Sequence, residues 1–191
     1  RFTNSYSSTP TCTPARAAIL TGLSPWNHGM LGYGAIARTY PFEMPVALQA
    51  IGYSTSSIGK DHFGWDSKTH LPPLDPRTDT GDKGSGTPHG YQSMSLYDGL
   101  VGELDDYHQW FAREMPDHKA EDGWPTLSMN SWMGAPFVFE EYLHPTAWVG
   151  QQAVDWIANV STDQPWFLKV SFHRPHSPYD PPARVLNATS A

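Results

Sequence analysis

The amino-acid sequence predicts an α/β fold, because a predicted helix is followed by a predicted strand in two places. Met44–Gly52 has a proline near its start and a glycine at its end, as a short helix does, and Tyr53–Ile58 alternates like a strand. Later, the apolar spacing from His144 to Ile157 predicts a helix with Pro145 at its start. The apolar run Trp166–Phe172 then predicts a buried strand.

The composition is that of a globular chain. Its 191 residues are 39% hydrophobic, with eight Trp, nine Tyr and eight Phe, which suffices for a packed core. The formal net charge of −7 argues against a nucleic-acid-binding surface, where a basic stripe is expected. The single cysteine excludes an internal disulfide and a site of several thiolates. No apolar run approaches the roughly 20 residues that span a bilayer, so no membrane span is predicted.

The only cysteine lies at the start of a further predicted helix. Thr13 suits the N-cap, Pro14 the first helical position and Gly22 the end of that helix. Backbone N–H groups and the positive end of the helix dipole favour an anion there, whether a thiolate or a bound oxyanion. Arg16 lies one helical turn later and can direct its planar donors to the same point. Cys12 and Arg16 are therefore candidate functional residues, although a lone cysteine is commonly a small buried hydrophobic residue.

Ionisable residues follow the ends of both predicted strands. Lys60 and His62 lie in Gly59–Gly64, two residues apart, so they point the same way if the chain stays extended. His173–Pro182 follows the second strand and contains His176 among prolines that stiffen the loop. Ligands of open α/β sheets bind beyond the carboxyl ends of the strands, so both segments lie where a binding site is expected.

These segments together resemble the formylglycine-dependent sulfatases of the alkaline-phosphatase-like superfamily. Cys12–Arg16, followed by Leu20–Gly22, resembles the signature C-x-P-[SA]-R-x-x-x-L-x-G of that family. Gly59–Gly64 is similar to its G-K-x-H-x-G segment. Pro165–Leu168 and Pro175–Pro178 are similar to its P-F-F-L strand and P-H-x-P loop. The resemblance implies an alkaline-phosphatase-like α/β/α sandwich with a mostly parallel sheet, present here only in part.

The resemblance also implies roles for individual residues. Cys12 would be oxidised to formylglycine by a dedicated formylglycine-generating enzyme, and the hydrated aldehyde would be the nucleophile. Lys60 would bind the sulfate and the formylglycine hydroxyl. On chemical grounds, Arg16 is a further cation that could hold the non-bridging sulfate oxygens. His62 would take a proton from that hydroxyl when sulfate is expelled. His176 would contact a sulfate oxygen and protonate the departing alcohol.

Some positions carry weaker or unusual signals. The middle position of the second motif is more often aromatic in the family and is Asp61 here. His173 and Arg174 lie beside the expected site and are candidates for substrate contact, with exposure on the surface as the alternative. Lys169 alternates with the core positions of its predicted strand and is interpreted as structural.

The family's Ca²⁺ site is expected to be incomplete. Family members begin with a strand that ends in paired aspartates and later carry an Asp-Asn or Asp-Gln pair, and neither element lies in this sequence. Cys12, as formylglycine, is the one expected metal ligand, and the remaining Ca²⁺ ligands would lie outside the chain. We therefore expect residues 1–191 to be part of a sulfatase catalytic domain without its opening strand and later half, in which an irregular substrate-side insertion runs from about 65 to 143. Within that insertion, Asp105–Met115 is predicted to be an amphipathic helix.

The sequence leaves several functional readings open. The favoured one is a sulfuric ester hydrolase acting on a sulfate ester, for which a sulfated carbohydrate is one candidate and small aryl or choline esters are others. A phosphonate or phosphate monoester hydrolase of the same superfamily would use the same Cys12 and Arg16. A catalytically silent fragment that acts only as a binding module is the third. The resemblance implies a location outside the cytoplasm, although the sequence contains no signal peptide.

Overall fold

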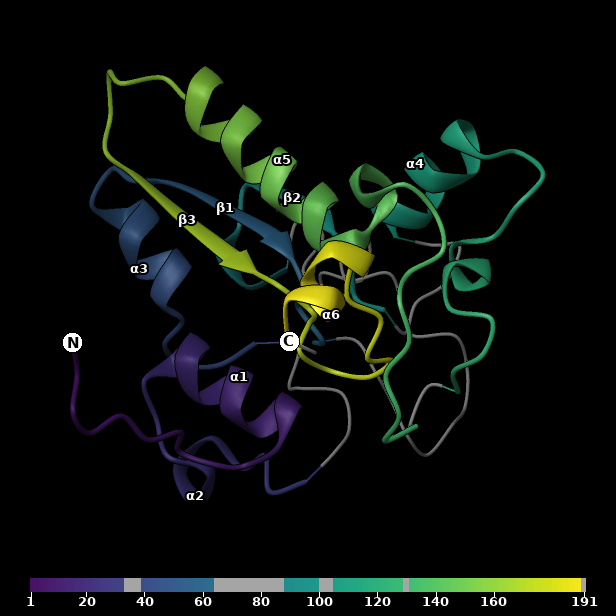
Figure 1. Cartoon of the computed structure of the whole chain (residues 1–191). Coiled ribbons are helices and arrows are strands. Elements are labelled where there is room, and N and C mark those ends of the chain that lie inside the picture. Colours follow the sequence, from purple (N-terminus) through teal and green to yellow (C-terminus); the bar gives the residue numbers. More distant parts are fainter. Residues whose placement is uncertain (33–38, 64–87, 100–104, 129–130, 190–191) are drawn as a thin grey trace. The chain divides into compact units, whose positions relative to one another are not determined.

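The computed structural model describes residues 1–32, 39–63, 88–99, 105–128 and 131–189 (Figure 1). The described residues form helices, short 3₁₀ turns and strands that alternate along the chain. The helices are α1 (Cys12–Thr21), α2 (Pro25–His28), α3 (Met44–Ala50), α4 (Asp106–Glu114), α5 (Pro145–Asn159) and α6 (Ala183–Thr189). The 3₁₀ turns are η1 (Pro88–Gly90), η3 (Ala120–Gly123) and η4 (Glu141–Leu143), and the strands are β1 (Ser54–Gly59), β2 (Ser93–Leu96) and β3 (Trp166–Ser171).

The strands pair in the order β2-β1-β3 (Figure 1). At the start of β1 the N–H of Ser54 donates to the carbonyl of Pro165 at 2.9 Å, and at its end the N–H of Lys60 donates to the carbonyl of Ser171 at 2.8 Å. Pairing therefore advances in the same direction along both strands, which is the parallel arrangement. The predicted α/β class with a mostly parallel sheet is confirmed.

The chain divides into two compact units, and each is described by itself. Each unit contains part of every strand. The first comprises Arg1–Ser57, Asp61–Met94 and Ser161–Lys169, and the second comprises Ile58–Lys60, Ser95–Val160 and Val170–Ala191.

The core of the first unit joins the inner face of α1 to residues beyond β1 and before β2. Its four buried side chains are Ala17, Leu20, Phe63 and Tyr91. Four partly buried side chains pack against them: Met30, Tyr40, Met94 and Phe167. Apolar burial at these positions is the main contribution to the stability of the unit.

The second unit has an aromatic core between α4 and α5. Tyr107 and Phe111 are buried on α4, and Trp148 is buried on α5, 5.7 Å from Tyr107 between ring centroids. The Tyr107 hydroxyl donates to the carbonyl of Leu143 at 2.8 Å, so its polar atom is satisfied although the ring is buried.

The first helix is found, but its start differs from the prediction. α1 begins at Cys12, the N-cap is Thr11, and its side chain makes no capping hydrogen bond, so the prediction that Thr13 caps the helix is wrong. Thr13 is instead fully buried inside the first turn. The end at Gly22 is confirmed: this residue has φ = 71°, which suits glycine, and its N–H donates to the carbonyl of Ala18 at 2.8 Å.

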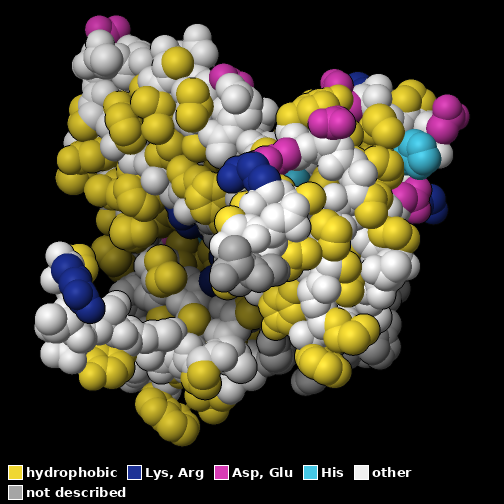
Figure 2. Space-filling model, in the orientation of Figure 1, with side chains coloured by type: hydrophobic (Ala, Val, Ile, Leu, Met, Phe, Trp, Pro, Cys, Tyr) yellow, Lys and Arg dark blue, Asp and Glu magenta, His cyan; other side chains and the backbone are white. Residues whose placement is uncertain are grey.

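The other predicted elements are present, with one correction. Helices 44–52, 105–115 and 144–157 correspond to α3, α4 and α5, and strands 53–58 and 166–172 correspond to β1 and β3. The expected burial of the last strand is wrong, since Trp166, Val170 and Phe172 are 40%, 36% and 45% exposed. Figure 2 shows hydrophobic side chains gathered on the surface around β3. β3 pairs only with β1 among the described strands, so it is an edge strand of that sheet.

Two elements were not expected. β2 is four residues long and half polar, too short to give a periodic signal, and α6 follows the proline-rich turn where no element was predicted. The interpretation of 65–143 as an insertion includes residues 65–87, 100–104 and 129–130, which lie outside the described residues, and it stays a prediction. Within the described ranges, no helix is both long and apolar enough to cross a membrane.

Candidate active site

Cys12 and Arg16 lie one turn apart on α1, in the first unit. Cys12 is the first residue of the helix, and both side chains are half-buried. Within the described residues, the buried Thr13 hydroxyl has no hydrogen-bond partner.

Lys60 and His62 lie where β1 ends, and both are buried. The N–H of Lys60, in the second unit, extends the pairing of β1 with β3. His62, in the first unit, has φ = 60°, which a residue other than glycine rarely adopts. The chain thus leaves the extended conformation at His62. The condition for Lys60 and His62 to point the same way, an extended chain, is therefore not met.

Asp61 is buried between these two residues and forms an ion pair with Lys169 of β3. The Lys169 ammonium group also lies 4.9 Å from the ring centroid of Phe63 and 5.0 Å from that of Tyr91. Burial, and then the charge of Asp61, raise the pKa of Tyr91. An ion pair therefore occupies the position at which the family more often has an aromatic residue.

The loop after β3 brings His173, Arg174 and His176 together in the second unit. The rings of His173 and His176 are 4.7 Å apart between centroids. The Arg174 Nη1 group donates to Nδ1 of His173 at 2.7 Å, so the proton of the neutral His173 ring is on Nε2. Nδ1 of the half-buried His176 donates to the carbonyl of Ser177 at 2.8 Å, which leaves its Nε2 for other contacts.

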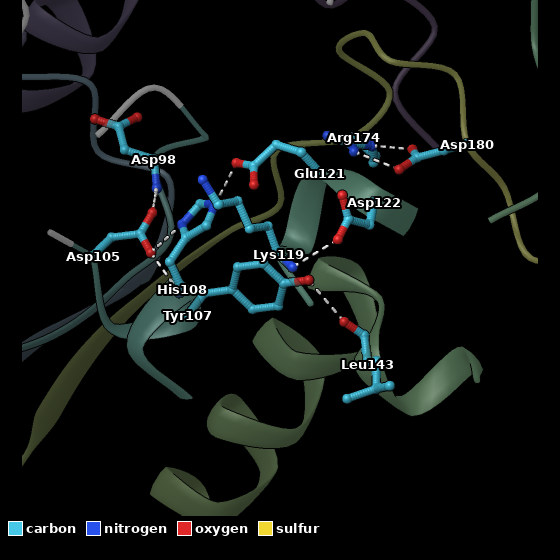
Figure 3. Close-up of polar contacts among 10 residues, drawn as sticks. All are labelled: Asp98, Asp105, Tyr107, His108, Lys119, Glu121, Asp122, Leu143, Arg174 and Asp180. Carbon is cyan, nitrogen blue, oxygen red and sulfur yellow. Dashed lines mark hydrogen bonds and ion pairs between the residues drawn. The ribbon is translucent and has the colours of Figure 1, made fainter. Parts of the chain in front are cut away.

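Asp180, which the sequence reasoning missed, fixes Arg174 (Figure 3). The guanidinium donates through Nε to Oδ1 at 2.5 Å and through Nη2 to Oδ2 at 2.7 Å. Nε2 of His144 lies 3.6 Å from Oδ1 of the same carboxylate. Burial raises the pKa of Asp180, but the nearby His144 ring and the hydrogen bonds from Arg174 outweigh it and lower the pKa overall. Arg174 therefore orients His173. If Arg174 also contacts substrate, as proposed, its guanidinium must do so while it donates to Asp180.

A second network near this loop was also missed. Nδ1 of His108 contacts Oδ1 of Asp105 at 2.6 Å, and its Nε2 contacts Oε1 of Glu121 at 3.2 Å (Figure 3). Burial lowers the pKa of His108, but the two carboxylates more than compensate and raise it to about 9. The spacing of Asp105 and His108 at a helix start is the one sequence signal that could have indicated this contact.

The described residues do not provide a complete metal site. Within the described ranges, no group of three or more His, Cys, Asp or Glu side chains could hold a metal ion. The candidate residues themselves are divided between the units: Cys12, Arg16 and His62 belong to the first, and Lys60, His173, Arg174 and His176 belong to the second.

Comparison with known structures shows the fold. The phosphonate monoester hydrolase of Agrobacterium radiobacter superposes with a TM-score of 0.65 at 20% identity, covering 93% of this chain and 34% of that chain. The structure of BT4656 in complex with D-glucosamine-2-N,6-O-disulfate gives a TM-score of 0.57 at 20% identity, covering 99% of this chain and 30% of that chain. The chain thus forms part of an alkaline-phosphatase-like α/β fold.

Sequence comparison shows the family. An arylsulfatase of Clostridium perfringens is 33% identical over 196 residues, which cover 95% of this chain and 37% of that relative. Human N-acetylgalactosamine-6-sulfatase is 28% identical over 191 residues, covering 93% of this chain and 33% of that relative. The chain spans about a third of the length of the curated relatives it matches. Because the Sulfatase family profile matches residues 1–191, the chain belongs to the sulfatase family.

Proposed function

We propose that the whole protein hydrolyses sulfate esters and that Cys12, converted to formylglycine, provides the nucleophile. The observation that carries the proposal is the position of Cys12 at the first residue of α1, one turn from Arg16, in a chain that the family profile matches throughout. When formed, formylglycine supplies a hydrated aldehyde whose hydroxyl attacks sulfur. Conversion requires a formylglycine-generating enzyme as a partner during maturation.

The chain's own residues would supply binding and proton transfer. Arg16 and Lys60 would neutralise the non-bridging sulfate oxygens, because fixed cations stabilise the charge that develops there. His62 would accept a proton from the hydroxyl at position 12 as sulfate leaves, and His176 would donate one to the alcohol oxygen as its bond to sulfur breaks. His173 and Arg174 are proposed substrate contacts in the same loop as His176.

Calcium enters the proposal only for the whole protein. The described residues do not form a set of oxygen ligands for that ion, so no step here uses it. Its remaining ligands would lie outside residues 1–191. We also propose that the region from about 65 to 143 forms a substrate-side insertion of a catalytic domain that continues beyond this chain.

The substrate is proposed to be a sulfated carbohydrate outside the cytoplasm. A relative and a structural neighbour that are named with carbohydrate substrates support this class: human N-acetylgalactosamine-6-sulfatase and BT4656 in complex with D-glucosamine-2-N,6-O-disulfate. Phosphonate monoester hydrolysis is the second candidate, because two phosphonate monoester hydrolases share the fold with TM-scores of 0.65. A silent binding module is the third.

The test is to express the whole protein with a formylglycine-generating enzyme and to measure the mass of the Cys12 peptide and the activity together. Conversion removes about 18 Da and abolishes alkylation by thiol reagents. We expect an aryl sulfate and a sulfated disaccharide to be cleaved with higher kcat/KM than an aryl phosphonate, and Cys12→Ala to lower kcat/KM by at least about 10³.

Ile19→Ala is the matched control, because Ile19 lies on the same helix with its side chain exposed. It should retain activity. Higher kcat/KM on the phosphonate would select the second candidate, whereas a persistent thiol with no turnover would select the silent module.

A further inference from the structure

The turn that carries His62 lies outside the regular sheet. His62 is buried, and its φ of 60° is a left-handed backbone conformation that residues other than glycine adopt at an energetic cost. Such a conformation persists only where the neighbouring residues are held firmly. Contacts of the residues on either side of His62 therefore help to determine where its imidazole lies.

One lysine contacts both of these neighbours. The ammonium group of Lys169 forms an ion pair with Asp61, and it lies over the ring of Phe63 at 4.9 Å from the centroid. The ring of Tyr91, 5.0 Å away, completes its surroundings. Asp61 is fully buried, so Lys169 compensates a charge inside the protein, and Phe63 is part of the core of the first unit.

Lys60 is held by a different contact. Its N–H donates to the carbonyl of Ser171 at 2.8 Å, which continues the backbone pairing of β1 with β3 and does not involve the Lys169 side chain. Losing the ammonium group of Lys169 should therefore loosen the turn at His62 more than it loosens Lys60.

We infer that Lys169 is a positioning residue for His62: by contacting Asp61 and Phe63 together, it fixes the left-handed turn that orients the imidazole. The inference rests on the proposed function, in which His62 accepts a proton as sulfate leaves. It gives a reason for the charged residue at position 61, where the family more often has an aromatic one, because that charge provides the anchor for Lys169.

The test uses the whole protein, matured with a formylglycine-generating enzyme, in wild-type form and as Lys169→Met, Lys169→Arg and Lys119→Met. Methionine keeps the length of the side chain and removes its charge, whereas arginine keeps a cation that can make both contacts. Lys119 is the matched control, since its side chain is exposed in the second unit. Histidine labelled with ¹³C at Cε1 reports the His62 ring by NMR, and the signal is assigned by its loss in His62→Gln.

We expect the His62 signal to shift or broaden in Lys169→Met, and to stay at its wild-type position in Lys119→Met and near it in Lys169→Arg. With an aryl sulfate, the kcat of Lys169→Met should fall at least about tenfold, while its kcat/KM changes less than about threefold. The reason is that the step served by His62 follows departure of the alcohol. If Lys169→Met does not fold, Asp61→Asn, which removes the other charge of the pair, takes its place in the same comparison.

A His62 signal that is unchanged in a folded Lys169→Met protein would overturn the inference, whatever happens to turnover. A wild-type protein without turnover would contradict the proposed function instead. In that case a displaced His62 signal in Lys169→Met would still support the positioning role, because the NMR measurement does not depend on catalysis.

Discussion

Among individual residues, His108 makes the clearest link between charge and stability. Its ring contacts Asp105, which also accepts the His108 backbone N–H at 2.8 Å as the N-cap of α4, and it contacts Glu121 on η3. The hydrogen bond from His108 is the largest cause that lowers the pKa of Glu121. Protonated His108 thus makes charge-assisted contacts with the N-cap of α4 and with η3, and joins the two.

The stability of the second unit should therefore depend on pH. The pKa of His108 is raised from 6.5 to about 9 in the folded state, so its contribution is complete below 6.5 and is lost as the pH rises through 9. We expect the free energy of unfolding to fall by about 3 kcal/mol between about pH 6 and about pH 10, since one pKa unit corresponds to about 1.4 kcal/mol. Denaturant unfolding across this range measures it.

His108→Gln should flatten the alkaline loss of stability. His118→Gln is the matched control and should leave the pH profile unchanged, because the His118 ring is exposed and lies 3.6 Å from Asp122. An equal alkaline loss in wild type and His108→Gln would assign the pH dependence to other groups.

The sequence indicates which residues are candidates for the chemistry, but it does not indicate which contacts hold them. Lys60, His62 and His176 are recognisable because their motifs are short and local. Their supporting contacts are not local: Asp61 and Lys169 are 108 positions apart, and this pairing depends on β1 and β3 being neighbours. Asp180 was missed because its buried role becomes visible only when Arg174 is seen to donate to it.

Among the elements, the pairing of β1 with β3 depends on a glycine. Gly59 has φ = 91°, and a Cβ atom there would lie 2.1 Å from the carbonyl oxygen of Ser171 and 3.3 Å from Cγ1 of Val149 on α5. Backbone cannot move aside as a flexible side chain can, so Gly59→Ala should lower the free energy of unfolding by about 2 to 4 kcal/mol.

Gly150→Ala is the opposite case on a neighbouring element. Gly150 lies inside α5, and a Cβ atom there would meet nothing within 4 Å. Alanine should therefore raise the free energy of unfolding by about 0.5 to 1 kcal/mol through its better helix propensity. Chemical denaturation of both variants measures the contrast, and equal effects of the two substitutions would contradict the strand contact at Gly59.

The elements with strong periodicity or proline and glycine boundaries were predicted within a few residues, as α3, α5 and β1 show. β2 was not, because four residues carry too little pattern, and its place beside β1 depends on long-range pairing. The prediction that β3 is buried was wrong. An apolar run indicates a strand that can be covered on both faces, whereas in the described residues this strand has one neighbour.

For the chain as a whole, the exposed apolar strand matters more than the net charge. A net charge of −7 opposes association, yet Trp166 and Val170 on β3 and Phe172 just after it expose apolar surface on an edge strand. Edge strands with exposed apolar side chains pair with other chains through their backbone groups. We therefore expect the 191-residue chain, prepared by itself, to self-associate as its concentration rises.

Two substitutions distinguish strand pairing from general hydrophobic contact. Val170→Lys places a charge on the edge strand, whereas Val154→Lys places the same charge on α5, where Val154 is 60% exposed. If association proceeds through β3, Val170→Lys should raise the dissociation constant, measured by sedimentation, at least about tenfold, and Val154→Lys should change it less than about threefold. A similar rise in both variants would instead indicate that apolar surface in general, or the added charge alone, governs association, because the two substitutions change net charge equally and differ only in the element that carries it.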